Sequence, residues 1–163
     1  TTEQRFEPVD KGEETDTDVY RIAVFMSPLD VHVNRSPMAA TIERMEHRTG
    51  KGMKRGPFRP AYKKESEYNE RVRTVFVDEQ GLRIEVTQIS GALARTIVPW
   101  QGIGDSMRRG QRYGMIRLGS RVDLRAPAAL FEPAVVSAEM AQEKHPKGEF
   151  VQAGSSVLFN PRT

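Results

Sequence analysis

The chain has 163 residues, of which 37% are hydrophobic and 29% are charged, and its formal net charge is +3. A chain of this length can bury a core of its own without cross-links. The absence of cysteine excludes disulfides, thiolate metal sites and cysteine nucleophiles. The three histidines, His32, His47 and His145, are not spaced as a metal-binding pair, so we expect no metal site. No apolar run approaches the roughly 20 residues that a membrane-spanning helix needs.

Period-two patterning dominates the chain and predicts strands, whereas no helical stripe exceeds about two turns. Residues 1–18 are polar and acidic, and we interpret them as a tail or connector before a folded domain of residues 19–163. The strands are expected, in chain order, at residues 19–26, 39–47, 73–77, 82–89, 92–98, 112–118, 122–124 and 157–159. Residues 78–81 (Asp-Glu-Gln-Gly) predict the turn of a hairpin between the third and fourth of these. The predicted class is all-β: a compact, β-sandwich or barrel-sandwich-like single domain with short strands and a long basic loop.

That long basic loop covers residues 48–64, where glycines and prolines interrupt any regular element. It carries seven basic residues and no acid, and the whole chain has 18 Arg against 7 Lys. Phe58 and Tyr62 lie among the basic residues. A cationic loop of this kind suits an anionic surface, either nucleic acid or anionic lipid.

The motifs of several enzyme classes are missing. The sequence contains no Gly-x-Ser-x-Gly elbow, which argues against a serine hydrolase. The glycines of residues 102–110 lack the spacing of a phosphate-binding loop, and no helix is predicted to follow them.

Four blocks of sequence, taken in order, resemble the short bacterial and archaeal branch of the phosphatidylserine decarboxylases. The resemblance covers residues 19–127 and extends weakly beyond them. The most distinctive blocks contain Asp-Val-His-Val-Asn-Arg and Ile-Arg-Leu-Gly-Ser-Arg-Val-Asp. The four blocks span residues 25–37, 68–71, 88–97 and 110–124.

The resemblance implies that the enzyme makes its cofactor from its own backbone and needs no metal. In this family a serine hydroxyl attacks the preceding glycine carbonyl, the peptide becomes an ester, and elimination and hydrolysis release ammonia. The matching pair here is Gly119-Ser120, and glycine leaves the attacked carbonyl unobstructed. The products would be a β chain of residues 1–119 and an α chain of residues 120–163 that begins with a pyruvoyl group. The pyruvoyl ketone would condense with the substrate amine and accept the electrons left when carbon dioxide departs.

Further site residues follow from the same resemblance. His32 is the candidate that returns a proton to the substrate carbon, because histidine titrates nearest to neutral pH. Asn34 and Arg35 follow on the same loop and could hold the phosphate or carboxylate of the head group. His47 and His145 are expected to be surface residues.

Other polar residues of the matching blocks are not assigned to catalysis; these are Gln88, Arg95, Arg121 and Asp123. Ser155 is the competing cleavage residue, because the chain contains Gly154-Ser155-Ser156 and some long-branch relatives cut within Gly-Ser-Thr. A cut there would leave nine residues, too few to be held by packing. A motif shared by residues 104–110 and 148–154, Gly-acid-x-apolar-x-x-Gly, also explains Gly154 as part of a turn. Ser120 is therefore favoured.

Two features of the family are missing. No Ala-Asp-Gly motif precedes residue 25, and Pro8-Val-Asp10-Lys-Gly12 is the nearest sequence. Arg35 occupies the place where longer-branch members have a second histidine, so the base for self-cleavage is either His32 or absent. We expect the chain to be an excised portion that lacks the amino-terminal anchor.

The leading hypothesis is therefore a lyase that converts phosphatidylserine, or archaetidylserine, to the ethanolamine lipid. Its expected partners are the lipid, an anionic membrane surface and its own two cleaved chains, with no nucleic acid. The expected location is peripheral, at the cytoplasmic face of the membrane. The alternatives are a non-catalytic barrel-sandwich module and a basic β-barrel that binds RNA through residues 48–64. A carrier module would require a lysine at a hairpin tip, and no such lysine stands out.

Overall fold

The structure, a computed structural model, describes residues 2–3, 19–48, 69–91, 96–117, 120–135 and 149–163. These ranges contain strands, turns and bends but no helix, which confirms the all-β prediction. The chain divides into two compact units, one of residues 25–123 and one of residues 1–24 and 124–163. It passes between the units within β2 (Val19–Met26) and β10 (Ser120–Pro127). Most of the basic loop, residues 49–64, lies outside the described residues.

The first sheet of the unit 25–123 is built around the predicted hairpin. Its strands follow the order β10, β6 (Arg83–Ser90), β5 (Arg71–Val77), β4 (Ala40–Arg48) and β8 (Ser106–Met107). β5 pairs with β6 in antiparallel register, with Phe76 opposite Ile84. In the turn between them, Asp78 Oδ1 accepts hydrogen bonds from two backbone N–H groups, and Gly81 adopts a φ of 83°. The hairpin prediction is confirmed.

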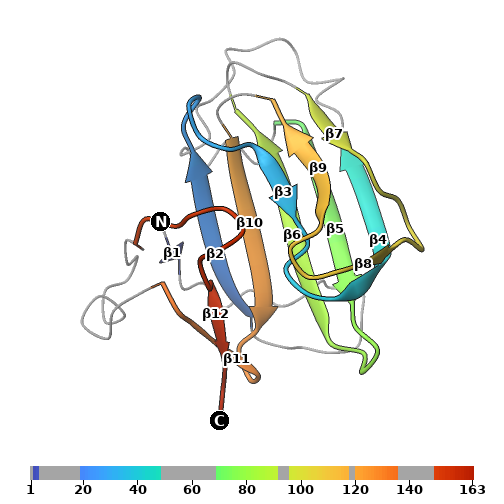
Figure 1. Ribbon diagram of the computed structural model, residues 1–163, viewed down its shortest axis with the longest axis vertical. Coiled ribbons are helices and arrows are strands. Elements are labelled where there is room, and N and C mark those ends of the chain that lie inside the picture. Colours follow the sequence, from blue (N-terminus) through green and yellow to red (C-terminus); the bar gives the residue numbers. More distant parts are fainter. Residues whose placement is uncertain (1, 4–18, 49–68, 92–95, 118–119, 136–148) are drawn as a thin grey trace. The chain divides into compact units, whose positions relative to one another are not determined.

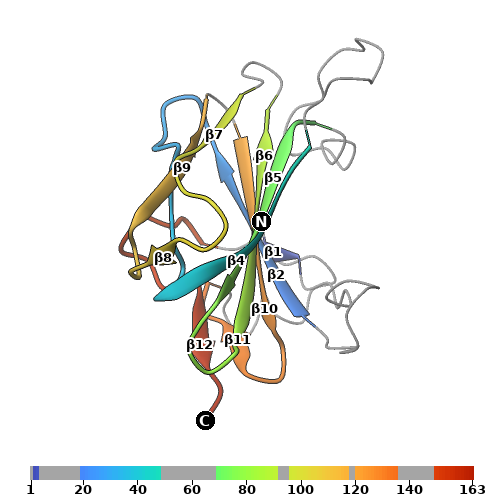
Figure 2. The same cartoon turned by 90° about the vertical axis from the view of Figure 1, so that its right-hand side faces the viewer.

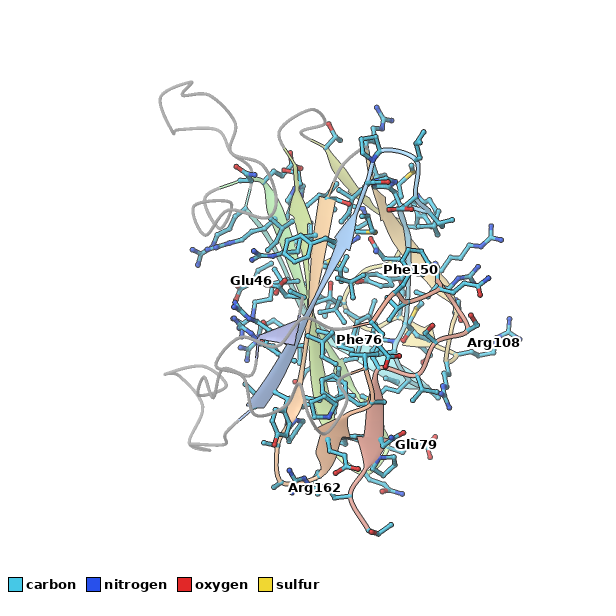
Figure 3. The ribbon with its side chains drawn as sticks, turned by 90° about the vertical axis from the view of Figure 1, so that its left-hand side faces the viewer. Glu46, Phe76, Glu79, Arg108, Phe150 and Arg162 are labelled. Carbon is cyan, nitrogen blue, oxygen red and sulfur yellow. The ribbon has the colours of Figure 1, made fainter. Side chains whose placement is uncertain are left out.

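The second sheet of this unit has the order β3 (Val33–Arg35), β9 (Arg112–Ile116) and β7 (Ile97–Pro99). Figure 2 shows β7 and β9 of this sheet as a layer to the left of β5 and β6. Buried residues of the two sheets meet between these layers, so this unit is the expected sandwich. Phe76, labelled in Figure 3, meets Tyr113 edge to face with ring centroids 5.2 Å apart. The adjoining core cluster consists of Val72, Ile97 and Ile116, with Met26, Met45 and Val122 packed against it.

The other unit contains β1 (Thr2–Glu3), the first part of β2 and the last part of β10 in one sheet. A separate two-stranded sheet pairs β11 (Phe131–Pro133) with β12 (Phe159–Pro161). The rings of Phe131 and Phe159 pack edge to face across it. The Arg162 guanidinium stacks over Tyr20 and donates to its hydroxyl at 3.0 Å. These contacts join the two ends of the chain within one unit.

Candidate active site

Ser120 is the first residue of β10, and its side chain is buried with 1% exposure. Side chains alternate along a strand, so Ser120 shares a face with Val122, which packs against the core cluster. The Ser120 hydroxyl donates to the Met26 thioether, with Oγ 3.9 Å from Sδ. A thioether is a weak acceptor, so this contact leaves the hydroxyl loosely held. Gly119, the other half of the predicted cleavage site, lies outside the described residues.

Met26 is also the last residue of β2, and the turn that follows it is held by its own hydrogen bonds. We call residues 27–32 the 27–32 turn. The Ser27 backbone N–H donates to Asp30 Oδ2 at 2.6 Å, and the Asp30 N–H donates to the Ser27 carbonyl at 3.0 Å. The hydrogen bond from Ser27 is the main cause that lowers the pKa of Asp30 below its ordinary value, and His32 lowers it further. The carboxylate therefore stays charged at neutral pH and keeps the turn closed.

His32 ends this turn, and both its ring and its backbone are held. Its Nδ1 lies 2.7 Å from the Asp30 carbonyl oxygen. A carbonyl can only accept, so Nδ1 carries a proton in this contact. The His32 carbonyl accepts from the Ile116 N–H at 3.0 Å. The turn therefore begins beside Ser120, which Met26 contacts, and its last residue is bonded to β9. Figure 1 shows the turn at the end of the sheet where β10 begins.

Asn34 and Arg35 both have structural partners. Asn34 is buried opposite Gly114, and its Oδ1 accepts from Gln88 Nε2 at 2.6 Å. The exposed Arg35 donates from Nη1 to the Gly110 carbonyl at 2.8 Å, in the turn between β8 and β9. Their predicted contacts with a head group stay predictions.

Comparisons with known proteins show to which family the chain belongs. A family profile described as phosphatidylserine decarboxylase matches residues 3–158. The chain belongs to this family. The resemblance seen in the sequence blocks is thereby confirmed, and no solved structure matches the chain.

Phosphatidylserine decarboxylase proenzymes of Thermobifida fusca and Streptomyces coelicolor are each 49% identical to the chain, over 71% and 76% of its length. A Methanococcoides burtonii protein, named provisionally as an archaetidylserine decarboxylase proenzyme, is 40% identical over 71% of the chain. The matches cover 49%, 51% and 52% of these three relatives. The chain spans about half the length of the curated relatives it matches.

In this member of the phosphatidylserine decarboxylase family, three of the four polar residues not assigned to catalysis have structural partners too. Gln88 links the two sheets through Asn34, a role that sequence reasoning missed because 54 residues separate the pair. Arg121 and Asp123 form a buried ion pair at 2.8 Å, and the Arg121 guanidinium lies over the Phe25 ring. Arg95 lies outside the described residues.

The competing serine and the second histidine lie elsewhere. Ser155 is exposed in a turn closed by a hydrogen bond from the Gln152 N–H to Ser156 Oγ at 2.8 Å, with Gly154 at a φ of 80°. This geometry fits the interpretation of Gly154 as a turn residue. His47 is exposed, as expected, and its Nε2 lies 2.8 Å from a Glu70 carboxylate oxygen. His145 lies outside the described residues.

The described residues contain no group of three metal-ligating side chains. They also contain no helix long and apolar enough to cross a membrane.

Proposed function

We propose that the protein removes the carboxyl group of a serine-headed phospholipid after cutting itself between Gly119 and Ser120. The observation that carries the proposal is the position of Ser120, buried at the beginning of β10 beside the 27–32 turn in a chain of this family. The word proenzyme in the names of the relatives supports a processing step. Self-cleavage, the pyruvoyl group and the substrate belong to this proposal.

In the processing step, Ser120 Oγ forms a bond to the carbonyl carbon of Gly119 and the peptide C–N bond breaks, which gives an ester. Elimination then removes the proton from Ser120 Cα and breaks the Cβ–Oγ bond, which releases the new carboxylate of residues 1–119 and leaves a dehydroalanine. Addition of water releases ammonia and leaves a pyruvoyl group at the start of residues 120–163. The weak Met26 contact suits this role, because a hydroxyl held by a strong acceptor would have to break that bond first.

The pyruvoyl group, once formed, supplies the electron sink for decarboxylation. The residues around it fit such a group, because Met26 and Val122 present apolar atoms that exclude water from Ser120. In the reaction the substrate carboxylate leaves as carbon dioxide and a proton takes its place on the same carbon. His32 would hold that proton on Nε2, since Nδ1 is committed to the Asp30 carbonyl.

The substrate class follows from the relatives, whose printed names refer to phosphatidylserine and to archaetidylserine. The two lipids share the head group that carries the chemistry, so the same site residues serve both. Asn34 and Arg35 are the residues of this chain that we propose for the head group.

The lipid must be reached at a membrane surface, and we propose that residues 48–64 supply electrostatic attraction to it at the cytoplasmic face. Each basic residue near an anionic leaflet contributes about 1 kcal/mol, and the attraction decays within a Debye length. Replacing Lys51, Lys54, Arg55 and Arg59 with serine should reduce binding to anionic vesicles, and raised salt should have the same effect. Equal binding to neutral and anionic vesicles would contradict this role.

Intact mass under denaturing conditions, combined with release of labelled carbon dioxide, tests the proposed function. The unmodified protein should show two chains divided between residues 119 and 120 and should release carbon dioxide from serine-labelled lipid. Ser120→Ala should stay as one chain and release none, whereas Ser155→Ala is the matched control that should cut and react normally. A single uncut chain that still decarboxylates, or cleavage abolished by Ser155→Ala, would overturn the assignment. An uncut and inactive chain in a longer form that carries the Ala-Asp-Gly motif would favour the non-catalytic alternative, whereas an uncut 163-residue chain alone is explained by the missing aspartate of that motif.

A further inference from the structure

The 27–32 turn exposes two apolar side chains to solvent, where they contribute no stabilisation through burial. Leu29 is 97% exposed and Val31 is 61% exposed. The hydrogen bonds between Ser27 and Asp30 and from the His32 ring to the Asp30 carbonyl fix the backbone on both sides of these residues. The two side chains are therefore presented outward by a closed turn.

This turn is also attached to the candidate active site. It begins immediately after Met26, whose sulfur contacts Ser120 Oγ, and it ends at His32, whose carbonyl binds the Ile116 N–H. Arg117, the residue after Ile116, is exposed and adds a cation at this end of β9. Apolar tips, a cation and the reacting residue thus share one end of the unit 25–123 (Figure 1).

From this juxtaposition we infer that the 27–32 turn is a membrane-docking element, in which Leu29 and Val31 enter the outer part of a lipid bilayer. The inference rests on the proposed function, because a lipid substrate is what requires the site to face a bilayer. Surface-bound segments bury their apolar side chains about 5–10 Å into the boundary between head groups and acyl chains. That depth keeps the Asp30 carboxylate in the hydrated head-group layer, where its bond to Ser27 persists.

The bilayer is favoured over a second protein because of the substrate. A lipid head group must leave the plane of its neighbours to reach Ser120, and an apolar turn next to Ser120 shortens that path. The basic residues at 48–64 would attract the protein from a distance, whereas the turn would fix its depth and orientation. The two contributions differ in salt dependence, since burial of apolar area is not screened.

The chain contains no cysteine, so a single cysteine with an environment-sensitive dye can be placed at one chosen position. In Leu29→Cys, the dye should shift its emission to the blue when vesicles of phosphatidylserine and phosphatidylcholine are added. The matched control is Ile103→Cys, because Ile103 is 67% exposed in the separate turn of residues 102–105, which is hydrogen-bonded to Ile42 on β4. Its dye should not shift.

A second measurement uses unlabelled protein. Leu29→Ser combined with Val31→Ser should weaken vesicle partitioning about tenfold or more, as expected when two aliphatic side chains no longer leave water. Ile103→Ser should change it less than twofold.

No shift at residue 29 on vesicles that bind the protein, or an equal shift at residue 103, would overturn the inference. A shift that appears with rising protein concentration in the absence of lipid would mean that a second copy covers the turn, and would also overturn it.

The readout does not need catalysis, so the two proposals fail separately. A shift at residue 29 in a protein that releases no carbon dioxide would preserve the docking element and remove the proposed function. Carbon dioxide release without the shift would do the reverse.

Discussion

At the scale of single residues, the tautomer of His32 is the feature with the clearest chemical consequence. The Asp30 carbonyl at 2.7 Å requires a proton on Nδ1, and in the proposed mechanism Nε2 is the atom that exchanges a proton with the substrate. The backbone of the same residue is fixed to β9 through Ile116. The ring therefore has a defined orientation before any substrate arrives.

We predict that His32→Ala lowers turnover by roughly two to four orders of magnitude, the range for loss of a general acid. Self-cleavage is the control, and intact mass should show whether the two chains still form. Carbon dioxide release measured on the cleaved variant then reports on the proton-transfer step alone. Unchanged turnover in that cleaved variant would remove His32 from the mechanism.

Tyr113 illustrates a different residue-scale effect. The side chain is fully buried against Phe76, and burial raises the pKa of its phenol, so the hydroxyl is neutral. Within the described part of the chain, this hydroxyl has no hydrogen-bond partner. A buried hydroxyl without a partner loses its hydration and gains nothing in return.

We predict that Tyr113→Phe raises the free energy of unfolding by about 1 kcal/mol, because it removes the hydroxyl and keeps the ring contact. Thermal or denaturant unfolding measures the change. The control is Phe76→Leu, which shrinks the partner ring and should lower stability by about 1–3 kcal/mol. Destabilisation by Tyr113→Phe would show that the hydroxyl has a partner, such as an ordered water.

At the scale of elements, β4 contains a bulge whose carboxylate bonds Arg83 of β6, although β5 lies between these two strands. Ile42 pairs with Phe76 and Arg44 pairs with Val75, so Glu43 is the extra residue of a bulge. Glu43 accepts two hydrogen bonds from Arg83 at 2.8 Å each, one from Nε and one from Nη2. These bonds are the largest cause that holds the pKa of Glu43 below its ordinary value of 4.5.

We predict that Glu43→Gln lowers stability by about 0.5 kcal/mol at pH 7, a small effect because both side chains are partly exposed. A lowered folded-state pKa means that the stabilisation is complete above pH 4.5 and is lost as the pH falls through the folded value. Denaturant unfolding should therefore show a larger difference at pH 7 than at pH 3. Arg83→Gln should behave alike, and a constant difference across this range would contradict the ion-pair explanation.

At the scale of the whole molecule, the proposed cut falls at the beginning of an interior strand. β10 lies between β2 and β6 in the strand order, and both of these neighbours belong to residues 1–119. One compact unit is itself assembled from residues 1–24 and 124–163. The two products of cleavage are therefore parts of the same folded units.

We predict that the cleaved chains stay together under native conditions. Size exclusion should give one peak with the mass of both chains, and denaturant should release residues 120–163 as a separate species. Mixing separately produced residues 1–119 with residues 120–163 is the comparison, since the seven-stranded sheet is divided between the two parts. Separation of the chains in native buffer would contradict the role of β10 as a shared interior strand.

The sequence by itself determined the all-β class, the hairpin around residues 78–81 and the family. Alternation of apolar side chains and turn-forming residues are local properties, and local signals survive in a single sequence. The same reasoning was less accurate for short elements. No strand was expected at β3, at β8 or at β11.

The tertiary structure alone decided which residues meet. Met26 contacts Ser120 across 94 residues, and Asn34 bonds Gln88 across 54. It also decided that Leu29 and Val31 face outward, although their apolar character in the sequence is equally compatible with a core. The physical reason is that strand order, register and sheet-on-sheet packing are set by contacts between distant segments, and those contacts have no period that one segment can display.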